Sequence, residues 1–113
     1  MPEQGDILLV PIPFTDFSSQ KRRPVIVISN NSYNKKTTDV IVVAMTSNPV
    51  EADYSFSITS DDLAKGTLNH PGKVRVDKIY TISTSIVVKT FGRVKEEVLG
   101  KIRKELQRLI AKK

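Results

Sequence analysis

Three consecutive cations occupy positions 21–23, and a run of β-branched residues follows at 25–28, directly after Pro24. Valine and isoleucine have restricted side-chain rotamers and fit a pleated, buried surface, so residues 25–28 are predicted to form an interior strand. Pro24 has no N–H to donate, which suits the first residue of that strand. A rigid strand therefore begins where the charges end. It holds Arg23 at the rim of a core, where a guanidinium can meet an anion repeatedly in one geometry.

The composition indicates an ordinary globular protein. With 113 residues, of which 39% are hydrophobic and 27% charged, the chain predicts a single domain spanning residues 1–113. The absence of cysteine excludes disulfide and thiolate sites, and one histidine excludes a His-rich metal site. No apolar run approaches the length of a membrane span, and the N-terminus lacks the layout of a signal peptide. We therefore expect a cytoplasmic protein with no membrane partner.

The net charge of +6 favours a polyanionic partner, but its distribution weakens that argument. Residues 95–113 contain seven cations and three anions, so much of the excess lies in a terminal segment. The cluster at 21–23 is a stronger indication of nucleic-acid binding, because it is local and adjoins a strand.

Short runs of β-branched and aromatic residues, separated by turn residues, recur along the chain and predict an all-antiparallel sheet. A polar loop is expected at 14–21, a turn or short helical segment at 29–36, and a long connection between 60 and 72. The expected strands are 6–13, 25–28, 40–45, 54–59, 74–80 and 86–91.

Gly92 ends this pattern, and from Val94 onward apolar residues recur at helical spacing, at Val98, Ile102, Leu106 and Leu109/Ile110. The spacing predicts one amphipathic helix of about four turns. The helix is interpreted as a lid on the core, and the alternative is a docking face for a partner helix. Strands closed by one helix predict a mainly β fold, either a small barrel or a coiled antiparallel sheet.

The sequence also resembles the PemK/MazF-type toxins of bacterial toxin–antitoxin systems. The blocks that carry the resemblance are GDI at 5–7, PFTD at 13–16, KRRPVIVIS at 21–29, VVAMTS at 42–47, VRVDKI at 74–79 and FGRV at 91–94. They span nearly the whole chain in the order that the family has them. The resemblance implies an SH3-like barrel with short helices, usually a homodimer. It also implies a sequence-selective, metal-independent endoribonuclease that cuts single-stranded RNA, requires no cofactor and is blocked by an antitoxin peptide.

Cutting RNA without a metal uses the 2′-hydroxyl of the substrate as nucleophile and leaves a 2′,3′-cyclic phosphate. Charge that builds on the phosphoryl oxygens must meet preorganised donors. Arg23 is the first candidate, because its fork of donors matches a phosphate, and the resemblance makes it the catalytic arginine. The resemblance also places Thr46 beside it as a hydroxyl donor. The alternatives are a solvated surface cation for Arg23 and a local backbone hydrogen bond for Thr46.

The sequence does not assign the group that accepts the proton of the 2′-hydroxyl. Some family members carry a carboxylate five residues before the arginine, where this chain has Ser18. Some carry a histidine just before it, where this chain has Arg22. Asp16 and Asp77 are the acidic residues nearest in the motifs, and neither is assigned as the base.

RNA contacts are expected from loops and strand ends. Lys21 and Arg22 are candidates for backbone phosphates, or else form a loop charge run in water. Phe14, Phe17 and Tyr33 could stack on bases, although Phe14 could equally belong to the core. His70, in a turn, is interpreted as structural or solvent-exposed. The full set of RNA-binding candidates is Lys21, Arg22, Phe14, Thr15, Asp16, Ser18, Ser47, Asp77 and Lys78.

Two rival functions remain open. One is a non-catalytic toxin of the same fold that inhibits a protein such as DNA gyrase, which the missing loop carboxylate favours. The other is a basic small-barrel module that binds RNA without toxicity.

Overall fold

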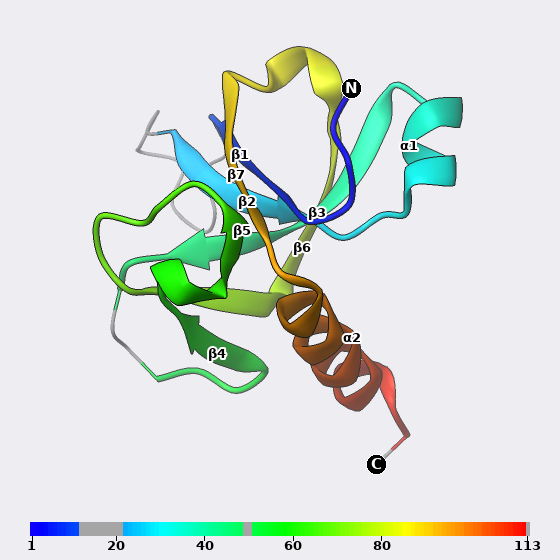
Figure 1. The fold of residues 1–113 in the computed structure, drawn as a ribbon. Helices are drawn as coiled ribbons and strands as arrows, with labels where there is room; N and C mark the ends of the chain where they lie inside the picture. Colours follow the sequence, from blue (N-terminus) through cyan, green and yellow to red (C-terminus); the bar gives the residue numbers. More distant parts are fainter. Residues whose placement is uncertain (12–21, 49–50, 113) are drawn as a thin grey trace.

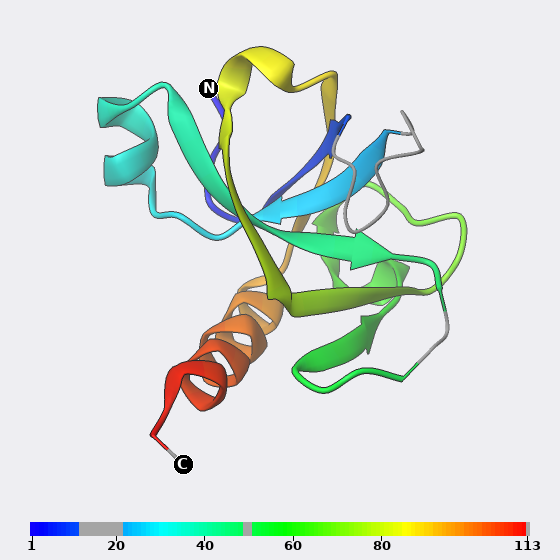
Figure 2. The ribbon, with the colours of Figure 1, turned by 180° about the vertical axis from the view of Figure 1, so that it is seen from behind.

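The structure, a computed structural model, describes residues 1–11, 22–48 and 51–112. Seven strands form one antiparallel sheet in the order β4-β6-β3-β2-β1-β7-β5, and the sheet curls strongly upon itself (Figure 1, Figure 2). The curled sheet with its C-terminal helix confirms the mainly β, small-barrel fold. The strands are β1 (Asp6–Val10), β2 (Arg23–Val27), β3 (Asp39–Thr46), β4 (Ser55–Ile58), β5 (Leu63–Lys65), β6 (Gly72–Ser83) and β7 (Lys89–Val94).

Apolar side chains fill both faces of this sheet, which explains why its central strands are almost continuously hydrophobic. One face packs against the C-terminal helix, and we call its contents the helix-side core. It includes Ile7, Ile26, Val43, Met45, Ile58, Val74, Val98 and Ile102. We call the cluster on the other face the second core. It contains Leu8, Val10, Val25, Val27, Val40, Val42 and Ile82, with Tyr80 and Val87 partly buried against it.

The helices are α1 (Asn31–Lys36) and α2 (Glu96–Ile110), and two single 3₁₀ turns, η1 (Ser60–Asp62) and η2 (Thr84–Ile86), lie between strands. Helix α1 confirms the helical alternative for the segment after β2. It begins at Asn30, whose side chain accepts a hydrogen bond from the backbone N–H of Tyr33 at 2.8 Å. Neither helix has the length and apolar character of a membrane span in the part of the chain that the structure describes.

Several of the predicted boundaries were wrong. The last strand begins at Lys89 rather than at position 86, because η2 occupies 84–86, and it continues through Gly92. Gly92 is part of β7 because the carbonyl oxygen of Lys65 lies 2.7 Å from where its Cβ would be, so only glycine lets β5 pair there. The predicted connection at 60–72 contains η1 and β5, and the strand predicted at 74–80 extends over Gly72–Ser83.

Helix α2 covers the helix-side core, which confirms its interpretation as a lid. Val98, Leu99 and Ile102 are buried, whereas Ile110 is 74% exposed because the last turn extends beyond the sheet (Figure 1). Two cation–π contacts join the helix to the segment around β4. The Nζ of Lys101 lies 5.6 Å from the ring centroid of Phe56, and the guanidinium of Arg108 lies 5.2 Å from that of Tyr54.

Candidate functional site

The start of β2 and the end of β3 place Arg23 and Thr46 on the same face of the sheet. Arg23 pairs directly with Val10, whose side chain is in the second core. Val25 pairs with Ala44, and the same register continued by two residues sets Arg23 opposite Thr46. Residues that stand opposite each other on antiparallel strands project their side chains to one face. Both side chains therefore belong to the rim of the second core, and the Nε of Arg23 is buried there.

Thr46 makes the local backbone contact that the sequence left as an alternative. Its Oγ1 accepts a hydrogen bond from the backbone N–H of Asn48 at 3.0 Å. A hydroxyl that accepts in this way keeps its own hydrogen as a donor, so this contact orients the group without removing its ability to donate to a phosphate. The next strand places Lys73 opposite Thr46, and the Nζ of Lys73 lies 3.1 Å from the carboxylate of Glu51.

Strand β6 adds an ion pair to this face. Arg75 stands opposite Ala44, and its Nε and Nη2 donate to the two carboxylate oxygens of Asp77 at 2.9 and 2.8 Å. This hydrogen bonding raises the pKa of Arg75 and lowers the pKa of Asp77, because each charged form stabilises the other. The guanidinium of Arg75 is thereby held in a fixed plane, which suits recognition of an oxyanion.

Tyr80 lies within electrostatic range of both Arg23 and the ion pair. Its phenol is half-buried, and burial raises its pKa, while the charges of Arg23 and Arg75 lower it and that of Asp77 raises it. All three charged groups therefore lie close enough to the phenol to act on its pKa. This face of the sheet thus carries two guanidiniums, one carboxylate and a neutral phenol, with Thr46 at its edge. Such a site favours a polar anion, such as a phosphodiester.

A register shift explains why Arg75 and Tyr80 share a face. Residues five apart on a regular strand point to opposite faces, because side chains alternate. Here Val43 pairs with Ile79 and Ala44 pairs with Arg75, so residues 76–78 are extra on β6. This bulge returns Tyr80 to the face of Arg75. Sequence reasoning missed both residues. The signal that could have identified Arg75 was its spacing of two residues from Asp77, which places an ion pair on one side of a strand.

The other predicted site residues divide into three groups. Arg22 and Ser47 are exposed next to the ends of β2 and β3, whereas Asp77 and Lys78 lie in the bulge of β6. Tyr33 was predicted to stack on bases, but it lies on α1, which follows the opposite end of β2 from Arg23, so the structure does not bring it to the site. The candidates that lie outside the described residues are Phe14, Thr15, Asp16, Phe17, Ser18 and Lys21.

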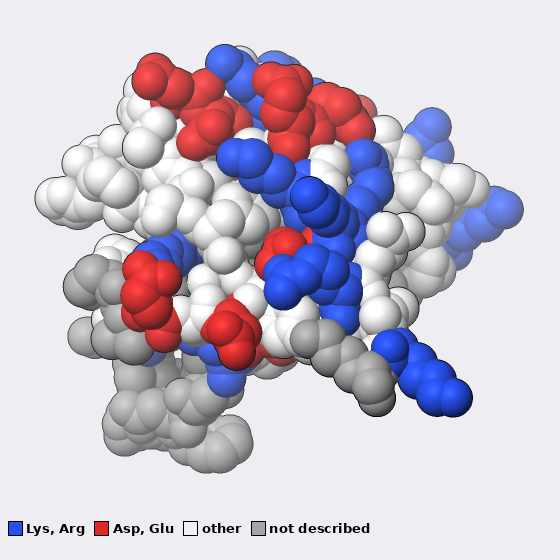
Figure 3. Space-filling view, turned by 90° about the horizontal axis from the view of Figure 1, so that it is seen from below, with Lys and Arg blue, Asp and Glu red and all other residues white. Residues whose placement is uncertain are grey.

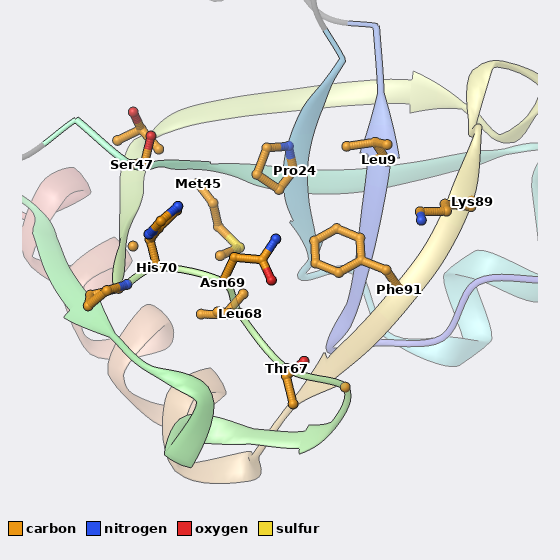
Figure 4. A pocket seen from close by; sticks show the side chains of 14 residues that line it. Leu9, Pro24, Met45, Ser47, Thr67, Leu68, Asn69, His70, Lys89 and Phe91 are labelled. Atoms are coloured by element: carbon orange, nitrogen blue, oxygen red, sulfur yellow. The ribbon is translucent and has the colours of Figure 1, made fainter.

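A pocket of about 550 Å³ opens on the other side of the same strand ends (Figure 4). Pro24, Met45 and Phe91 contribute to it from three strands, and residues 66–71 close it from the connection between β5 and β6. His70, which was interpreted as structural or exposed, is exposed at this pocket.

The basic α2 is a weaker candidate for RNA binding than this region. Arg103 lies 2.7 Å from Glu96, and Arg108 lies 2.5 Å from Glu105. Figure 3 shows cationic and acidic side chains next to one another on the face seen from below. The excess charge of the terminal segment is therefore partly compensated within the helix.

Solved structures with the same fold are known. The chain is similar, with 22% identity and a TM-score of 0.76, to an endoribonuclease in complex with its cognate antitoxin from a mycobacterial species, over 96% of this chain and 93% of that one. It is similar, with 21% identity and a TM-score of 0.76, to a chain of MazE–MazF from Deinococcus radiodurans, over 96% and 95%. It is also similar, with 17% identity and a TM-score of 0.72, to the Mycobacterium tuberculosis toxin MazF-mt6, over 91% and 93%.

The comparison with curated protein sequences found no match. Family membership follows from a different comparison. The sequence model of the PemK-like, MazF-like toxins of type II toxin–antitoxin systems matches residues 3–110, which is nearly the whole chain. This match agrees with the resemblance found in the sequence motifs and with the curled sheet of the structure. The chain therefore belongs to the PemK-like, MazF-like toxin family of type II toxin–antitoxin systems.

Proposed function

We propose that this toxin is an endoribonuclease that cleaves single-stranded RNA through attack by the substrate's own 2′-hydroxyl. The observation that carries the proposal is the convergence of Arg23, Thr46, Arg75 and Tyr80 on one face of the sheet. Two guanidiniums and two hydroxyls are the kind of donors that stabilise charge building on a phosphoryl group. The similar mycobacterial structure described as an endoribonuclease supports the same reaction class.

In the proposed reaction, the scissile phosphate lies between Arg23 and Thr46, which donate to its non-bridging oxygens. The 2′-oxygen attacks phosphorus, and the bond from phosphorus to the 5′-oxygen breaks. Asp77 accepts the proton of the 2′-hydroxyl, and Tyr80 donates a proton to the departing 5′-oxygen. The products are a 2′,3′-cyclic phosphate and a 5′-hydroxyl. Arg75, held by Asp77, faces the charge that develops during this step.

The protonation states agree with these roles. Arg75 lowers the pKa of Asp77, so this carboxylate is ionised at neutral pH and can accept a proton. Burial raises the pKa of Tyr80, so its phenol stays neutral and keeps the proton that it donates. The two groups therefore start in the forms that an acceptor and a donor require.

The test is cleavage of a single-stranded RNA by the purified protein in EDTA. We expect products that end in a 2′,3′-cyclic phosphate, identified by mass spectrometry. Arg23→Ala should lower the rate by about 10²–10³-fold, the usual cost of losing one transition-state donor. Circular dichroism should show an intact fold, and Lys104→Ala, an exposed cation on α2, should cleave normally.

A substrate with 2′-deoxyribose at the cut site provides a second test. Because the nucleophile is missing, we expect no cleavage at that position and normal cleavage elsewhere. Cleavage of the deoxy position would contradict the mechanism. RNA binding without products in any substrate would favour the non-catalytic module instead.

We also propose that a cognate antitoxin peptide inhibits this toxin. We further propose that the toxin acts as a homodimer. The similar structures include toxins in complex with their antitoxins, which supports the first point. Light scattering of the purified toxin tests the second, and a monomeric mass would contradict it.

A further inference from the structure

The pocket on the far side of β2 and β3 adjoins the proposed cleavage site. Arg23 projects to the second-core face, whereas the next residue, Pro24, lines the pocket on the helix-side face. At the end of β3, both Thr46 and the residue after it, Ser47, line the pocket, so Thr46 belongs to the edge of both sites. An RNA strand that crosses these strand ends therefore passes directly from the proposed cleavage site into the pocket.

The walls of the pocket combine an apolar surface with polar groups at its edge. In Figure 4, the rings of Phe91 and Pro24 and the side chain of Met45 face its centre. Asn69 points inward from the connecting segment toward Phe91, and His70 lies beside Ser47 at one end. Lys89 marks the other end, and the complete lining is Leu9, Pro24, Met45, Thr46, Ser47, Gly66, Thr67, Leu68, Asn69, His70, Pro71, Gly72, Lys89 and Phe91.

The segment that closes the pocket is held in place by specific contacts. The hydroxyl of Ser60 accepts from the backbone N–H of Leu68 at 2.8 Å and donates to the carbonyl oxygen of Leu68 at 3.2 Å. Gly66 has a φ of +84°, and a Cβ there would lie 2.5 Å from the carbonyl oxygen of Phe91. The segment therefore starts in contact with β7, at the residue that supplies the aromatic ring. The pocket is preformed rather than created by its ligand.

We propose that this pocket binds one unpaired nucleobase of the RNA, next to the phosphate that Arg23 and Thr46 hold. The inference rests on the proposed function, because it assigns the base-recognition part of the same substrate. A nucleobase has a flat apolar face and a polar edge, and proteins recognise it by stacking on an aromatic ring and by hydrogen bonds to that edge. Phe91 supplies the ring, and Asn69 supplies both a donor and an acceptor. Lys89 lies where it can meet the RNA backbone.

Size and charge favour this occupant over a side chain of a peptide. A volume of about 550 Å³ is in the usual range for a small-molecule site and can hold a nucleoside. An apolar antitoxin side chain could contact Phe91 and Met45, but it would offer no hydrogen bond to Asn69, His70 or Ser47. It would also not use the cation at Lys89. A base with its phosphate uses all of these groups.

The experiment is an NMR titration of ¹⁵N-labelled toxin with the four nucleoside 3′-monophosphates. We expect saturable shifts of the amides at 66–71 and 89–91 and of the Asn69 side chain, larger for one base than for the others. Asn69→Ala and Phe91→Leu should weaken this binding about 10-fold or more, because each removes a stacking or edge contact. Lys104→Ala serves as the matched surface control. Absence of shifts at the pocket would overturn the proposal.

The titration is independent of cleavage, so its failure and that of the proposed function can be told apart. Base-specific shifts without RNA cleavage would support the pocket and contradict the nuclease. Normal cleavage, with unchanged base preference in Asn69→Ala and Phe91→Leu, would contradict the pocket alone. Loss of affinity for the antitoxin in these two variants, with RNA binding unchanged, would assign the pocket to the peptide and also overturn the proposal.

Discussion

The guanidinium of Arg75 donates to both carboxylate oxygens of Asp77, with its Nε at 2.9 Å from one and its Nη2 at 2.8 Å from the other. The two residues are two positions apart on β6, so their side chains leave the strand on the same side. The pair is a rigid unit, because a bidentate contact fixes the plane of the guanidinium. It lies on the face that carries Arg23 and Tyr80, where it supplies both a second cation and a carboxylate.

Asp77→Asn should lower RNA cleavage by about 10²–10⁴-fold, the usual contribution of a general base. An amide cannot accept the 2′-hydroxyl proton, and it accepts hydrogen bonds from Arg75 through one oxygen only. In the parent toxin, the rate should fall as the pH drops through the pKa of Asp77, which Arg75 holds below its ordinary value of 3.8. The measurement is single-turnover cleavage as a function of pH.

The decrease in cleavage rate at acid pH should disappear in Asp77→Asn, since asparagine does not titrate. Glu51→Gln is the matched control, because Glu51 is an exposed carboxylate that pairs with Lys73. A decrease at acid pH that is unchanged in Asp77→Asn would show that another group accepts the proton.

Tyr80→Phe should lower cleavage about 10²-fold, in the lower part of the range for general acids, with little change in stability. Phenylalanine keeps the ring that packs on the second core and loses only the hydroxyl. A substrate with sulfur in place of the 5′-bridging oxygen distinguishes a proton donor from a positioning group. Sulfur departs without a proton, so on this substrate Tyr80→Phe should cleave nearly as fast as the parent.

Tyr33→Phe on α1 is the control, because the structure places it at the opposite end of β2 from Arg23. If the loss in Tyr80→Phe is equally large with oxygen and with sulfur, Tyr80 is not the general acid.

The parts of this site that were predictable from sequence depend on local signals. The strand after Pro24 has a run of β-branched residues, so the position of Arg23 at its start follows from residues next to it. Arg75 and Tyr80 were missed because their common face depends on the bulge between β3 and β6, and a register shift leaves no clear mark in one strand. The three-residue β5 was missed for a related reason, since it is too short to show a period.

The stability of the fold should decrease at both ends of the pH range, with a contribution from Asp77 at the acid end and from Tyr80 at the alkaline end. The folded state lowers the pKa of Asp77, so its contribution is present above the ordinary value of 3.8 and is lost as the pH falls through the lowered value. The folded state raises the pKa of Tyr80, so its contribution is present below 10.0 and is lost as the pH rises through the raised value.

Urea denaturation at a series of pH values measures this dependence. Tyr80→Phe should flatten the alkaline side and leave the acid side unchanged. Asp77→Asn should flatten the acid side, and it should also change the alkaline side slightly, because the charge of Asp77 helps to raise the pKa of Tyr80. A variant that flattens neither side would mean that its residue titrates alike in the folded and unfolded chains.

Two glycines should respond to alanine with opposite signs. Gly66 has a φ of +84°, and a Cβ there would lie 2.5 Å from the carbonyl oxygen of Phe91, so Gly66→Ala should destabilise the fold by about 1–3 kcal/mol. Gly100 lies in α2 with nothing within 4 Å of an added Cβ, so Gly100→Ala should stabilise it by about 0.5–1 kcal/mol. Urea denaturation measures both changes. Gly66→Ala should also weaken nucleotide binding, because Gly66 begins the segment that closes the pocket beside Phe91. If Gly66→Ala were as stable as the parent, this segment would not contact β7 closely at Gly66, and the pocket would not be preformed in the way described.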